Sequence, residues 1–210
     1  MIINKNDKKF SQLLGQIEDC PKKIYCLGNV DLLQEKKIIA VVGSRQMSEY
    51  GKMIINKLVP ELVKENFVIV SGMAFGVDAE VQKVCVENQG KTVAVLAGGV
   101  DVISPLGNKW LYEKILKNNG LIVSEWPDKT EPSKINFLKR NRIVSGLSLG
   151  VLVIEGSVKS GTRVTARLAA EQGREVFCVP GRIDDDNSFA PNFLIKNGAV
   201  MITEISDIII

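Results

Sequence analysis

The sequence contains no histidine, and this absence removes much of the usual catalytic chemistry. Without imidazole there can be no Ser-His-Asp triad, no Cys-His pair and no histidine ligand for zinc. The four cysteines, Cys20, Cys26, Cys85 and Cys178, are dispersed and form no C-x-x-C pair. This spacing argues against a thiolate metal site and indicates reduced, structural thiols. We therefore predict no enzyme activity, no metal and no cofactor.

Long hydrophobic runs are also missing. The longest ones, Gly150–Ile154 and Ile208–Ile210, are far too short to span a bilayer. The charged N-terminus is not followed by an apolar segment of the kind found in secretory signals, so we expect a cytoplasmic protein without membrane contact. The net charge is only +3, which disfavours coating of a polyanion along the whole surface and permits a focused basic groove.

Short apolar runs alternate with helical patterns over most of the chain. The runs are apolar on both faces, as in central strands of a parallel sheet covered on both sides. This rhythm predicts an α/β fold, an extended Rossmann-like, doubly wound and mostly parallel sheet with helices on both faces. The expected strands are 38–42, 67–71, 92–97, 121–124, 150–154, 175–179 and 199–202; the expected helices are 49–65, 78–88, 109–118, 135–147, 162–172 and 192–197, with Pro60 ending or kinking the first.

Residues 1–35 differ from the rest because they are polar and weakly periodic. We predict an N-terminal arm with a short helix around Phe10–Ile17, packed on a main domain of residues 36–210.

The segment Lys134–Arg142 concentrates charge locally. It holds four cationic side chains and one aromatic, Phe137, and no acid. Cations attract phosphates, and an aromatic beside them gives an unpaired base a surface to stack on. The alternative is a solvated helix face whose aromatic enters the core.

Four glycine-containing turns follow predicted strands, where ligands bind in doubly wound sheets. They are Val41-Val-Gly-Ser-Arg45, Ser71-Gly-Met-Ala-Phe-Gly76, Leu96-Ala-Gly-Gly-Val-Asp101 and Glu155-Gly-Ser-Val-Lys-Ser-Gly-Thr162. Each can expose backbone N–H groups to an anion, although tight turns need glycine even where nothing binds. None matches the dinucleotide or Walker A signature.

The order of these motifs resembles the DprA/Smf family of DNA-processing proteins. The segments that carry the resemblance, over about residues 17–200, are the turns at 41–45, 71–78, 94–101 and 155–166, together with Ser124-Glu-Trp-Pro127, Phe137-Leu-Lys-Arg-Asn-Arg-Ile143, Gly173-Arg174, Val179-Pro-Gly181, Leu194-Ile195 and Gly198-Ala199. In the arm, Asp19-Cys-Pro21 and Leu27-Gly-Asn29 fit as well.

The resemblance implies a dimeric Rossmann-like protein that binds single-stranded DNA without sequence specificity. It also implies hand-over of the strand to the RecA recombinase during natural transformation. The DNA-binding residues predicted in this way are Gly43, Ser44, Arg45, Ser71, Gly72, Lys134, Phe137, Lys139, Arg140, Asn141, Arg142, Ser160, Gly161, Thr162 and Arg163.

Two other functions remain open from the sequence. Nucleoside monophosphate phosphoribohydrolases share the scaffold, but their P-G-G-x-G-T-x-x-E signature requires a glutamate where this chain continues Arg163-Val-Thr165. The other is a Rossmann module that binds a small nucleotide without chemistry. We expect Glu125 and Glu155 to cap turns or to orient Arg140 and Arg142, and Asp184–Asp186 to form a solvated loop.

Overall fold

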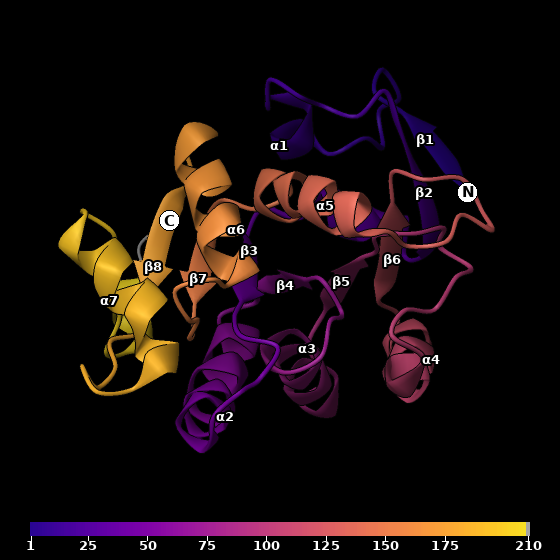
Figure 1. Ribbon diagram of the computed structural model, residues 1–210. Helices are drawn as coiled ribbons and strands as arrows, with labels where there is room; N and C mark the ends of the chain where they lie inside the picture. The colour runs from indigo at the N-terminus through magenta and orange to yellow at the C-terminus, as the bar shows by residue number, and fades with distance from the viewer. Residues whose placement is uncertain (209–210) are drawn as a thin grey trace.

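The computed structural model describes residues 1–208 and contains a single nine-stranded mixed sheet (Figure 1). The spatial order is β1-β2-β6-β5-β4-β3-β7-β8-β9. The strands from β3 to β9 are mutually parallel, while β1 and β2 are antiparallel additions beside β6. Their bounds are β1 Ile2–Asn4, β2 Lys23–Gly28, β3 Ile38–Val42, β4 Val68–Ser71, β5 Thr92–Val95, β6 Leu121–Ser124, β7 Gly150–Val153, β8 Glu175–Cys178 and β9 Val200–Met201.

Helices cover both faces of this sheet, which confirms the predicted doubly wound class (Figure 1). On one face lie α1, α5 and α6, and on the other lie α2, α3 and α4. Every residue of β3 to β7 is buried, because both sides of these strands are covered. The helices are α1 Gln12–Gly15, α2 Glu49–Lys64, α3 Val77–Glu87, α4 Lys109–Lys117, α5 Lys134–Gly146, α6 Gly161–Glu171 and α7 Phe189–Lys196.

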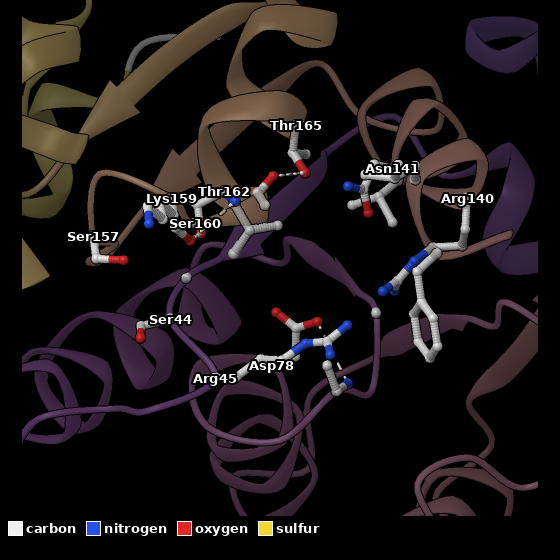
Figure 2. Close-up of a pocket in the computed structure, with 18 of the residues that line it drawn as sticks. Ser44, Arg45, Asp78, Arg140, Asn141, Ser157, Lys159, Ser160, Thr162 and Thr165 are labelled. Carbon is white, nitrogen blue, oxygen red and sulfur yellow. Dashed lines mark hydrogen bonds between the residues drawn. The ribbon is translucent and has the colours of Figure 1, made fainter. Parts of the chain in front are cut away.

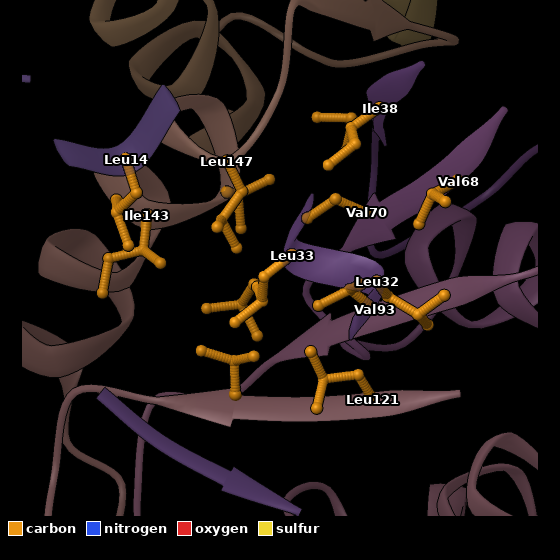
Figure 3. Packing of buried hydrophobic residues seen from close by; sticks show 14 of the residues in the cluster. Leu14, Leu32, Leu33, Ile38, Val68, Val70, Val93, Leu121, Ile143 and Leu147 are labelled. Atoms are coloured by element: carbon orange, nitrogen blue, oxygen red, sulfur yellow. The ribbon is translucent and has the colours of Figure 1, made fainter. Parts of the chain in front are cut away.

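The N-terminal segment contributes side chains to the main hydrophobic core. Leu14 of α1 packs in the same buried cluster as Ile143 of α5 and Leu147, which follows that helix, and Leu32 and Leu33 join them against the sheet (Figure 3). Strands β1 and β2 extend the sheet itself and were not predicted. Their signal is weak in the sequence because β1 has three residues and both strands lie within a lysine-rich, polar stretch.

Pro60 was predicted to end or kink its helix, and the predicted ending is wrong: α2 continues through Pro60 to Lys64. Proline removes one intrahelical hydrogen bond. Tertiary packing outweighs this loss, because Ile55, Leu58, Val59 and Leu62 are buried against α3 and the sheet. The last helix is longer than predicted and begins at Phe189.

Candidate nucleic-acid interface

The chain reverses its winding direction between β3 and β7. These strands are parallel neighbours, but β4 to β6 extend the sheet on one side of them and β8 and β9 on the other. In sheets of this type, ligands bind beyond the carboxyl ends of the strands at this switch point. A cavity of about 450 Å³ lies here, lined by the turns after β3 and β4, by α5 and by the start of α6 (Figure 2).

The turn after β3 places one cation at the cavity. Gly43 packs so closely on α3 that an added Cβ would lie 2.6 Å from the Val77 side chain. The buried Ser44 hydroxyl is used within the turn, since it donates to the carbonyl of Gln46 and accepts from its N–H, both at 3.1 Å. Arg45 is exposed, and its guanidinium lies 4.9 Å from the ring centroid of Phe137.

Helix α5 contributes the aromatic ring and a buried cation. Phe137 is half-buried and lines the cavity together with Asn141. Arg140 is only 4 % exposed, and its Nη1 donates to the Val95 carbonyl at 3.0 Å. Gly72, after β4, leaves room for this guanidinium, because a Cβ at that position would overlap it.

One carboxyl group, Asp78, lies beneath the cavity at the start of α3. It is buried and accepts a hydrogen bond from the N–H of Ala74 at 3.4 Å. Burial raises the pKa of Asp78, while the charge of Arg140 acts in the opposite direction. Burial likewise lowers the pKa of Arg140. The lining of the cavity is cationic on balance, since it includes three cations, Arg45, Arg140 and Lys159, and this one acid.

The N-terminus of α6 forms the opposite wall (Figure 2). Ser160 is the N-cap: its hydroxyl accepts from the N–H of Thr162 at 3.2 Å and donates to the Thr162 hydroxyl at 2.7 Å. Gly161 is exposed, and a Cβ added there would meet nothing within 4 Å. A helix N-terminus carries unpaired N–H groups and partial positive charge, so this wall favours an anion.

Five of the predicted DNA-binding residues lie outside the cavity lining. Lys134 and Lys139 are exposed on α5, and the buried Ser71 hydroxyl donates to the Val41 carbonyl at 2.8 Å. Arg163 lies over Phe193, 4.7 Å from its ring centroid, beside a second groove between α6 and α7. The fifth is Arg142. The other ten predicted residues line the cavity: Gly43, Ser44, Arg45, Gly72, Phe137, Arg140, Asn141, Ser160, Gly161 and Thr162.

Arg142 is held in an ion-pair network away from the cavity. Its Nη2 donates to Glu125 at 2.6 Å, and its Nε donates to Asp19 of the N-terminal segment at 2.8 Å. Glu125 therefore orients Arg142, as expected from the sequence. Glu155 accepts from both the N–H and the hydroxyl of Ser48, which begins α2, so it caps a turn.

Sequence reasoning missed several lining residues, among them Ser157, Lys159 and Thr165. The first two belong to the glycine-containing turn that follows β7, so their position after a strand was the available signal. Within residues 1–208, no three acidic, cysteine or histidine side chains are grouped so that they could hold a metal ion. No helix in that range has the length and apolarity needed to cross a membrane.

The fold and the cavity define a class: a Rossmann-like α/β protein with a cationic cavity at its switch point. The family model for DNA recombination-mediator protein A matches residues 1–210. The DNA processing protein DprA of Bacillus subtilis is 40% identical over 203 residues, which are 97% of this chain and 68% of the relative. The chain belongs to the DNA recombination-mediator protein A family.

Solved structures of relatives have the same fold. DprA of Streptococcus pneumoniae superimposes with a TM-score of 0.93 at 39% identity, covering 99% of this chain and 72% of the other. DprA of Helicobacter pylori, described for its single-stranded DNA binding mode, gives a TM-score of 0.87 at 32% identity, covering 98% and 95%. The family membership supports a DNA-processing role for this chain.

Proposed function

We propose that this protein binds single-stranded DNA without sequence specificity, through the switch-point cavity and the surface of α5 around it. The observation that carries the proposal is that Arg45 lies over the half-buried Phe137 ring and that both line one cavity with two further cations, Arg140 and Lys159. Cations bind phosphates, and an aromatic ring or a guanidinium plane accepts any unpaired base. The H. pylori relative, 32% identical, has a described single-stranded DNA binding mode.

The competing enzyme function has little support at this site. A phosphoribohydrolase would need a glutamate at position 165, and Thr165 there donates its hydroxyl to the Gly161 carbonyl at 3.4 Å. The carboxyl that does line the cavity, Asp78, is buried. We therefore propose a binding role rather than catalysis.

The form of the DNA provides the first test. A stacking ring is useful only where bases are unpaired, so single strands should bind at least tenfold more tightly than a duplex of equal length. Equal or tighter duplex binding would contradict the proposal.

The salt dependence of binding provides a second test. The slope of the logarithm of the binding constant against the logarithm of the salt concentration should be about −0.7 for each contacted phosphate. Arg45→Ala should flatten that slope by roughly 0.7, whereas Lys117→Ala, on the exposed end of α4, should leave it unchanged.

We further propose that the protein acts in the cytoplasm as a homodimer and passes the bound strand to RecA. Met201 is an exposed apolar residue on β9, the strand at one edge of the sheet, and such an edge is suited to a second copy. Met201→Glu should then yield monomers in analytical ultracentrifugation at concentrations where the unmodified chain is dimeric.

The transfer of the strand to RecA has its own test. The lag before the strand-dependent ATPase activity of RecA begins should be shorter when the protein is present, and an unchanged lag would contradict this step.

A further inference from the structure

The guanidinium of Arg140 is buried and makes no salt bridge, although the charge of Asp78 in the same cavity acts on it. None of the ion pairs within residues 1–208 includes Arg140, its Nε makes no hydrogen bond, and only Nη1 is bound, to the Val95 carbonyl. A buried charge is costly to fold around unless it is paired. Arg140 lines the cavity, and Figure 2 shows its side chain directed toward the centre of the lining residues. An anion bound in the cavity would complete this site.

A second set of donors belongs to residues that line the same cavity. The backbone N–H of Gly161 opens α6 and has no intrahelical acceptor. In the preceding turn, the N–H groups of Ser157 and Lys159 also find no acceptor within the described part of the chain. Helix α6 has eleven residues, so the partial charge at its N-terminus is well developed.

The charge of the cavity fits a doubly charged anion better than a single one. Arg45, Arg140 and Lys159 offer three cationic groups to the cavity, against one carboxyl group, Asp78. A phosphodiester within a strand has one negative charge. A terminal phosphate monoester carries about −1.5 to −2 near neutral pH and presents three acceptor oxygens. A volume of about 450 Å³ also falls in the range of small-molecule sites.

We propose that this cavity binds the terminal phosphate monoester of a nucleotide, either at the end of a single strand or on a free nucleoside monophosphate, in preference to an internal phosphodiester. Arg140, Lys159 and the N-terminus of α6 hold the phosphate, while Arg45 and Phe137 lie beside the attached nucleoside. The inference rests on the proposed single-strand function for its strand-end form only, because a free nucleotide would use the same groups.

Binding of thymidine oligomers of one length tests the proposal. The oligomers carry a 5′-phosphate, a 3′-phosphate, hydroxyl ends only, or no ends in a circular form, and thymidine monophosphate and thymidine serve as competitors. Either the 5′-phosphorylated or the 3′-phosphorylated oligomer should bind about five- to tenfold more tightly than the hydroxyl-ended and circular forms. Thymidine monophosphate should compete, and thymidine should not.

A pair of variants places the phosphate. Lys159→Gln should reduce the preference for the phosphorylated end at least threefold, whereas Lys117→Gln on α4 should keep it. Equal affinity for all four oligomers, or a full preference retained in Lys159→Gln, would overturn the inference.

The outcomes also separate the two proposals. Equal, strong binding of all single strands would leave the proposed function intact and refute the terminal-phosphate site. Binding of thymidine monophosphate without binding of any single strand would refute the proposed function and leave the terminal-phosphate site intact. If none of these ligands binds, both proposals are refuted.

Discussion

Gly72→Ala is expected to weaken binding of single-stranded DNA by ten- to a hundredfold. A Cβ at position 72 would occupy the space now filled by the Arg140 guanidinium. Because Arg140 is buried and hydrogen-bonded to the Val95 carbonyl, its side chain could make room for a Cβ only by moving out of the cavity wall. Loss of a hydrogen bond to a charged group costs about 1.5–3 kcal/mol, which corresponds to this range of affinity.

The same substitution should cost about 1–3 kcal/mol of folding stability through overpacking. Affinity must therefore be measured per folded molecule, by fluorescence anisotropy at a temperature well below the melting transition. Gly15→Ala is the matched control, because a Cβ added on α1 would meet nothing within 4 Å. If Gly72→Ala folds and binds like the unmodified chain, Arg140 is not a ligand contact.

Phe137→Ala is expected to lose about 1–3 kcal/mol of binding free energy for each base stacked there. Because the ring is only half-buried and one of its neighbours is the exposed guanidinium of Arg45, its truncation should lower the melting temperature little. A ring buried in the core would instead cost about 3–5 kcal/mol of stability. Phe137→Trp should preserve binding, since the larger ring offers at least the same stacking area.

Ile135→Ala serves as the control for this experiment. Ile135 lies on the same helix, is 64% exposed and does not line the cavity, so its truncation should change neither affinity nor melting temperature appreciably. A large fall in the melting temperature of Phe137→Ala, with unchanged affinity per folded molecule, would show that the ring is a packing residue.

Much of the candidate site could be located from the sequence because it depends on local chemistry. The apolar runs indicated parallel strands, and the turns containing Gly43, Gly72 and Gly161 therefore had to lie at the same edge of the sheet. The cavity lies at that edge, and all three glycines line it. The missed lining residue Lys159 lies in one of these same turns.

In the segment Lys134–Arg142 the sequence predicts one cationic patch, but the structure separates its members. Lys134 and Lys139 face solvent, Arg140 is buried at the cavity, and Arg142 pairs with Asp19 and Glu125. Side chains two positions apart in a helix point about 160° away from each other around the helix axis. Arg140 and Arg142 must therefore meet different neighbours, whatever their shared chemistry.

The sequence by itself determined the class of fold, the sheet edge that carries the site and the family of the protein, because apolar periodicity and turn chemistry act over a few residues. Only the tertiary structure decided which cations face a ligand, that β1 and β2 join the sheet, and that α2 continues through Pro60. Those outcomes depend on partners far away along the chain: Val95 for Arg140, Asp19 for Arg142 and the sheet and α3 for α2. Contacts of this kind come from packing in three dimensions, which local pattern does not encode.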